Sequence, residues 1–257
     1  MLFEREGAEV SLGPTLRKLV TAAKFNPSLP YLSFLCINFD VPVVKEAASW
    51  FLNAVFLNYN SSYLERMLEQ MLDEGDSREV TRFLRAVDVR IDGFRVERAP
   101  EWRGQRVFVR HEVGGKAYEL RLSEESAGTQ KLMGLAAYLM TALERGGTVV
   151  VDELDAKLHP KLLRFVILLF KDPEVNKSGA QLIFSSQDVS TMRNDVFRRD
   201  EIWFAARGEG EASQLWSLAD IHEANGNLVS KNAAFDKQYL SGRYGADPYL
   251  TRIEEWD

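Results

Sequence analysis

Residues 146–160, GGTVVVDELDAKLHP, decide the fold. The two glycines end a preceding helix, and the run Thr148–Val151 predicts a short buried strand. Asp152 and Glu153 stand at the carboxyl end of that strand, where open α/β sheets place their ligands. Phosphoryl transfer requires one carboxylate that holds Mg²⁺ and a second that orients the attacking water. The pair suits these roles, and the alternative is an acidic pair that simply ends a strand.

The stretch LSEESAGTQK at residues 122–131 favours the first interpretation. Ser126 is a suitable N-cap for a long helix whose apolar positions include Leu132, Leu135 and Leu139. The N-terminus of a helix that opens with small residues binds anions, because its free N–H groups and its dipole point outward. The sequence therefore places an anion-binding helix directly before the carboxylate strand.

Together these stretches resemble the second half of the nucleotide-binding domain of ABC-type ATPases. They are most similar to the prokaryotic AAA-labelled, ABC-like ATPases of phage-defence and abortive-infection loci, which are relatives of the OLD and SMC-type ATPases. The resemblance implies an α/β fold: an ABC-ATPase-like partial sheet with flanking helices and an N-terminal helical arm subdomain. It divides the chain into a helical arm or middle region, 1–100, and a region 101–257 with the signature, Walker B and C-terminal parts of the ATPase domain.

Five blocks carry the resemblance, and they occur in the order expected for the family. They are the signature loop (Glu125–Thr129), Walker B (Val149–Glu153), the D-loop and its continuation (Leu154–Pro160), the strand before the switch histidine (Gln181–Asp188) and a motif near the C-terminus (Tyr239–Gly245). At the switch position this sequence departs from the family, because Gln187 replaces the histidine. Glutamine still donates a hydrogen bond to phosphate, but it cannot become cationic.

The resemblance also implies the ligands ATP and Mg²⁺ and a role for each matched residue. Asp152 is expected to hold Mg²⁺, Glu153 to orient the attacking water, and Gln187 to sense the γ-phosphate. Because Gln187 cannot become cationic as histidine can, we expect slow, switch-like turnover.

The signature loop of one ABC-like unit covers the nucleotide bound to the other unit of a dimer. Ser126, Ala127 and Gly128 are therefore expected to contact nucleotide in trans, and Asp155 to link the two sites. For Ser126 and Gly128 the alternative is an ordinary N-cap and a glycine needed for close packing.

The sequence contains no G-x-x-x-x-G-K-[ST] loop, whose N–H groups and lysine hold the β- and γ-phosphates. Relatives carry this P-loop upstream of the region that corresponds to Met1. We therefore expect the C-terminal part of such an ATPase, either a separate subunit completed by a P-loop-bearing chain or a truncated or non-hydrolysing version. The resemblance further implies a dimer of ATPase units and a nuclease or toxin effector as partner. The alternative function is a non-catalytic scaffold that has lost nucleotide hydrolysis.

Composition limits the size of the core, the kind of partner and the location of the protein. A chain of 257 residues with 46% hydrophobic content is long enough for one good core and a subdomain. The net charge of −6 argues against a surface that generally coats nucleic acid. A single cysteine, Cys36, excludes an internal disulfide and favours a cytoplasmic location, and the sequence has no apolar run long enough to span a membrane.

Periodicity predicts the other elements. Helices are expected over 14–25, 62–75, 77–87, 161–171 and 232–240, whereas 30–39 fits a helix or a strand. A further helix is expected to begin at a cap at Asp40 and to bury Val44, Ala47, Phe51 and Val55. Strands are expected at 94–96, 107–109, 117–120, 182–185, 202–205 and 214–218, with Gly114-Gly115 as a hairpin turn. His111 is expected to face solvent, because its parity is opposite to that of Phe108.

Overall fold

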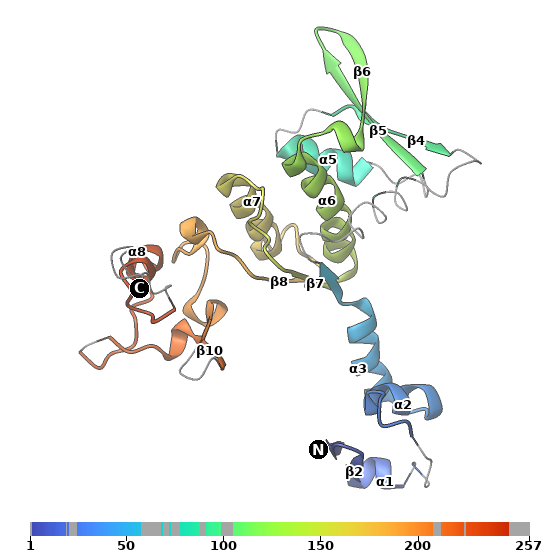
Figure 1. The fold of residues 1–257 in the computed structure, drawn as a ribbon, viewed down its shortest axis with the longest axis vertical. Coiled ribbons are helices and arrows are strands. Elements are labelled where there is room, and N and C mark those ends of the chain that lie inside the picture. Colours follow the sequence, from blue (N-terminus) through green and yellow to red (C-terminus); the bar gives the residue numbers. More distant parts are fainter. Residues whose placement is uncertain are drawn as a thin grey trace, which may run out of the picture.

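The computed structural model describes residues 2–18, 20, 25–57, 68, 72, 78–87, 91–98, 105–207, 212–223 and 225–246. Their buried apolar side chains form one large central core and two smaller cores, one near each end of the chain. Figure 1 shows the N-terminal and C-terminal segments extending from the central part in different directions. Most of the helix expected over 62–75 lies outside the described residues.

The central sheet has three parallel strands in the order β3-β7-β8. They are β3 (Val55–Leu57), β7 (Thr148–Val151) and β8 (Gln181–Phe184). Helix α6 (Ala127–Arg145) leads into β7 through Gly146, whose φ of 79° provides the left-handed C-cap. Helix α7 (Pro160–Lys171) joins β7 to β8. The mixed α/β fold with a partial sheet and flanking helices, which the sequence predicted, is confirmed.

The two faces of this sheet differ in burial. Val149 and Val151 on β7 pack into the central core together with side chains of α6 and α7. The opposite face carries Phe56, Val150 and Ile183 in register across the three strands. Phe56 is 64% exposed and Ile183 is 52% exposed. We call these three side chains the open row.

A second sheet is antiparallel and consists of β4 (Gly93–Arg98), β5 (Gln105–Val113) and β6 (Lys116–Arg121). Gly114 and Gly115 join β5 to β6 with φ values of 59° and 74°, which a two-residue hairpin turn of this type requires. Val107 and Val109 pack against α5 (Arg78–Ala86) and α6 in the central core. The β5–β6 hairpin projects beyond the helices (Figure 1). The predicted strands and turn are confirmed.

The N-terminal core is built from β1 (Phe3–Glu6), β2 (Glu9–Leu12), α1 (Pro14–Arg17), α2 (Tyr31–Asn38) and α3 (Pro42–Asn53). The ambiguous stretch 30–39 is therefore a helix. Three details of the prediction for α3 were wrong. The helix ends at Asn53, and Val55 belongs to strand β3. Val41 is the N-cap, while the Asp40 carboxylate pairs with Lys45 at 2.7 Å. Phe51 is 57% exposed, because the N-terminal core includes no described residue of α3 beyond Val44.

The C-terminal core contains the antiparallel pair β9 (Trp203–Arg207) and β10 (Ser213–Ser217) and the short helix α8 (Phe235–Leu240). The rings of Phe204 and Tyr239 stack at a centroid distance of 5.7 Å. The two strands confirm the prediction, and α8 begins three residues later than expected. No helix within the described residues is long and apolar enough to cross a bilayer.

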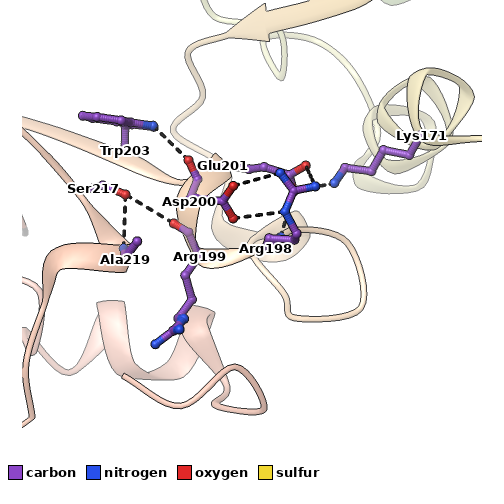
Figure 2. Close-up of polar contacts among 8 residues, drawn as sticks. All are labelled: Lys171, Arg198, Arg199, Asp200, Glu201, Trp203, Ser217 and Ala219. Carbon is purple, nitrogen blue, oxygen red and sulfur yellow. Dashed lines mark hydrogen bonds and ion pairs between the residues drawn. The ribbon is translucent and has the colours of Figure 1, made fainter. Parts of the chain in front are cut away.

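Four short 3₁₀ helices complete the described part of the chain: η1 (Leu122–Glu124), η2 (Val189–Thr191), η3 (Arg199–Glu201) and η5 (Leu218–Asp220). A group of ion pairs fastens η3 to the end of α7 (Figure 2). The Lys171 ammonium lies 2.5 Å from the Glu201 carboxylate, and Arg198 pairs with both Glu201 and Asp200. Burial raises the pKa of Glu201, but these two cations outweigh it and leave the pKa lowered. The residues leading into β9 are thus tied to the helix that follows the carboxylate turn.

Candidate functional site

The carboxylate pair lies at the carboxyl end of β7, where a turn over residues 152–157 begins. Asp152 and Glu153 are both exposed there. Ser185, at the end of the neighbouring strand β8, contacts both residues. Its hydroxyl donates to Asp152 Oδ1 at 2.5 Å and accepts the Glu153 N–H at 2.8 Å. The parallel pairing of β7 and β8 therefore fixes the two acidic residues through one serine that the sequence analysis treated only as part of a strand.

The backbone of this turn is unusual. Glu153 and Lys157 have φ values of 53° and 61°, in the left-handed region that residues other than glycine rarely adopt. Main-chain bonds hold the turn closed: Leu154 donates to the Ser185 carbonyl at 3.0 Å, and Ala156 donates to the Glu153 carbonyl at 3.1 Å. Strained backbone of this kind is concentrated at functional sites, which makes the turn a candidate on conformational grounds as well as chemical ones.

Lys131 on α6 is a residue of this site that sequence reasoning missed. Its side chain is buried, and its ammonium donates to the carbonyls of Glu153 at 2.8 Å, Leu154 at 3.1 Å and Ala156 at 2.8 Å. Burial lowers the pKa of Lys131, while the nearby charges of Asp155 and Glu153 act in the opposite direction. A lysine beside an apolar stripe normally extends its charge to the surface, so no local pattern indicated that Lys131 is buried.

The signature loop packs directly on the carboxylate turn. Ser126 caps α6: its Oγ accepts the Thr129 N–H at 3.2 Å and lies 2.8 Å from Thr129 Oγ1. A Cβ atom placed on Gly128 would lie 2.7 Å from the Lys157 carbonyl oxygen. These are the N-cap and the close-packing glycine that the sequence analysis named as alternatives to nucleotide contact. Ala127 is exposed at the start of the helix, and a trans contact from Ser126, Ala127 and Gly128 stays a prediction.

The switch position is joined to the D-loop. Gln187 is exposed just beyond β8, and its main-chain N–H donates to Asp155 Oδ1 at 3.3 Å. Asp155 itself is half-buried in the turn. The structure therefore brings Asp152, Glu153, Asp155 and Gln187 to one end of the sheet, with the signature loop beside them. Their catalytic and ligand-binding roles remain predictions.

The expectation that His111 faces solvent was wrong. Its Nε2 lies 2.6 Å from the Glu125 carboxylate, and both side chains are largely buried. His111 has the same parity as Val107 and Val109, whose side chains face the central core, and this parity was the relevant one. The contact fastens β5 to the residue that immediately precedes the N-cap Ser126.

The donors at the carboxylate pair are suitable for Mg²⁺, because carboxylate and hydroxyl oxygens are the hard ligands that this ion prefers. Asp152 is exposed, and the Ser185 hydroxyl orients its carboxylate. Among the described residues no group of three or more His, Cys, Asp or Glu side chains is arranged to hold a metal ion.

We expect Gly128→Ala to destabilise the chain by about 1–3 kcal/mol, because the added methyl group would overlap the Lys157 carbonyl. Urea unfolding of both proteins measures the difference. The control is Gly93→Ala on β4, where an added Cβ meets no atom within 4 Å. That control should change the free energy of unfolding by less than about 0.5 kcal/mol. Equal stability of the two variants would show that the signature loop does not pack on the turn as described.

The fold and the position of the acidic pair define an α/β domain whose candidate site lies at the carboxyl edge of a parallel sheet. A family model described as "AAA domain, putative AbiEii toxin, Type IV TA system" matches residues 30–193. The chain belongs to this family. The predicted AAA relationship is therefore confirmed, as is the coarser expectation of an ATPase-type nucleotide-binding domain. The matched residues extend across residue 100, and the division into regions 1–100 and 101–257 stays a prediction.

Comparison with solved structures gave a more distant likeness. A structure described as "Structural biochemistry of ATP-driven dimerization and DNA stimulated activation of SMC ATPases" is similar over 55% of this chain and 81% of that chain. The sequence identity is 16% and the TM-score is 0.37, which is too low to support an argument about this chain. The comparison with curated proteins gave no match.

Proposed function

We propose that the chain is an ATP-binding and ATP-hydrolysing half-domain that completes an ATP site with a P-loop from another chain or from an upstream half. The observation that carries this proposal is the Asp152-Ser185-Glu153 arrangement at the ends of β7 and β8. The 257 residues contain no P-loop motif, so the main phosphate-binding element must come from outside them.

Each residue has a task that its position allows. Asp152 would hold Mg²⁺, and the ion would supply positive charge that stabilises the phosphates of bound ATP. Glu153, exposed beside it, accepts a hydrogen bond from the attacking water and orients it. The capped N-terminus of α6 presents N–H groups to the nucleotide of the partner unit, and Gln187 donates a hydrogen bond to the γ-phosphate.

The open row supports the need for a covering partner. Parallel sheets are normally covered on both faces, yet Phe56 and Ile183 are more than half exposed. These apolar side chains stand on the same sheet whose strand ends carry Asp152 and Ser185. We therefore place the P-loop-bearing unit against this face, where it would bury apolar surface and bring its phosphate-binding loop towards the carboxylates.

The wider setting follows from the resemblance stated above. Two completed units would form a dimer in the cytoplasm and control a nuclease or toxin effector in bacterial anti-phage defence. The net charge of −6 gives no reason to add nucleic acid as a partner. Gln187 and the missing P-loop favour a second candidate, a non-catalytic scaffold that keeps the fold without hydrolysis.

Calorimetry with Mg²⁺·ATP on the isolated chain tests this proposal. Without the P-loop donors little offsets the desolvation of a triphosphate, so we expect a Kd weaker than about 1 mM and no hydrolysis. Addition of the P-loop-bearing unit should give tight ATP binding and ATP hydrolysis. Asp152→Asn in the same assembly is the matched control for Mg²⁺-dependent binding. Micromolar binding of ATP by the isolated chain would contradict the half-domain model. Binding without hydrolysis in the full assembly would favour the scaffold.

A further inference from the structure

Lys131 satisfies a group of acceptors that would otherwise repel one another. The carbonyls of Glu153, Leu154 and Ala156 all lie within 3.1 Å of its ammonium nitrogen. An ammonium has three N–H donors, and three carbonyls of one turn accept them. Three converging carbonyl dipoles are unfavourable in a buried site unless a cation stands between them. The lysine therefore acts as a cation tethered inside the turn.

The Lys131 hydrogen bonds also account for the left-handed backbone conformations in the turn. The left-handed φ values of Glu153 and Lys157 flank the three carbonyls that converge on the ammonium. Each of these conformations is unfavourable for a residue with a Cβ atom and needs surrounding contacts that enforce it. The Lys131 hydrogen bonds span the segment between the two strained residues, so they are the contacts best placed to hold both.

We propose that Lys131 is a positioning residue, and that its ammonium holds the turn in the conformation that presents the Glu153 carboxylate. The role for Glu153 rests on the proposed function, whereas the effect on the turn does not. Lys131 lies on α6, five residues after the N-cap Ser126. One side chain thus joins the helix behind the signature loop to the turn that carries Glu153. A displacement of the helix would therefore move the turn, and a displacement of the turn would move the helix.

Hydrogen exchange of the 257-residue chain without nucleotide tests whether the Lys131 ammonium holds the turn. In Lys131→Met the side chain keeps its unbranched apolar part but loses the cation, and amides of residues 154–158 should exchange at least about tenfold faster. The matched control is Lys161→Met, which removes an exposed lysine from the first turn of nearby α7 and should leave those amides unchanged. Exchange in Lys131→Met equal to that of the parent chain would overturn the proposal.

Chemical rescue covers the case in which Lys131→Met unfolds the whole chain. Lys131→Ala removes three carbons and the ammonium, which propylammonium would replace, whereas 1-propanol has the same number of heavy atoms and no charge. Slowed exchange with propylammonium alone supports a tethered cation. An equal effect of both compounds, or of neither, overturns it.

Kinetics of the complete ATPase assembly separate this inference from the proposed function. Lys131→Met should lower kcat by about 30- to 100-fold and change the KM for ATP by less than about threefold, because a misplaced carboxylate affects chemistry more than binding. If the parent assembly hydrolyses ATP and Lys131→Met is equally fast, the positioning role is wrong. If the parent assembly does not hydrolyse ATP, the proposed function fails, and hydrogen exchange alone decides whether the ammonium holds the turn.

Discussion

Glu153→Gln should lower single-turnover ATP hydrolysis by the complete assembly on the order of a hundredfold, while Mg²⁺·ATP stays bound. The amide keeps the size of the side chain and its hydrogen bonding, but it no longer offers a carboxylate to orient and polarise the water. The Ser185 contact involves the main-chain N–H of Glu153, so the substitution leaves it intact. The assembly should therefore accumulate in the closed, ATP-loaded state, which nucleotide retention on a desalting column measures.

Two further variants separate a loss of hydrolysis from a loss of Mg²⁺ binding and from a nonspecific effect of the substitution. Asp152→Asn should weaken Mg²⁺-dependent binding itself, because it removes charge from the expected ligand of the ion. Glu174→Gln makes the same chemical change at an exposed position after α7 and should leave both rate and retention unchanged. If Glu153→Gln hydrolyses ATP at the parent rate, the assignment of Glu153 as the residue that orients water is wrong.

The second large effect is expected at the open row. The double substitution Phe56→Thr and Ile183→Thr places a β-branched residue at each position in β3 and β8 but removes the apolar surface offered to the P-loop-bearing unit. Burial of each side chain contributes about 1.5–3 kcal/mol, so the assembly should form at least about a hundredfold more weakly. Analytical ultracentrifugation of mixtures at several concentrations measures this.

Leu215→Thr is the control for that experiment, because Leu215 is 68% exposed on β10 and lies outside the central sheet. It should leave assembly unchanged. Since Phe56 and Ile183 are already exposed, the free energy of unfolding of the double variant in urea should be close to that of the parent chain. Unchanged affinity in the double variant would mean that the P-loop unit does not use this face.

Much of the central architecture could be predicted because its signals are local. The N-cap at Ser126 and the left-handed Gly146 mark both ends of α6, and the β-branched run after them marks β7. The Gly114-Gly115 turn likewise fixed the register of its hairpin. In each case the determining residues lie within one turn or one strand, where propensity and capping act directly.

The contacts that complete the candidate site were not predictable in this way. Lys131 reaches carbonyls 22 to 25 positions along the chain, and Ser185 reaches Asp152 over 33 positions. Such contacts depend on how α6 and β8 pack beside β7, which periodicity does not specify. The error at His111 had a local cause, since its parity was compared with Phe108 and not with the buried Val107 and Val109.

The left-handed backbone at Glu153 has a consequence for evolution and engineering. Glycine or asparagine would adopt this conformation more readily than glutamate, by on the order of 1 kcal/mol. A selection that rewards thermal stability alone would therefore favour loss of the acidic side chain from this position. Keeping a glutamate there sets a trade-off between stability and activity, and libraries aimed at a more robust protein should hold residue 153 fixed.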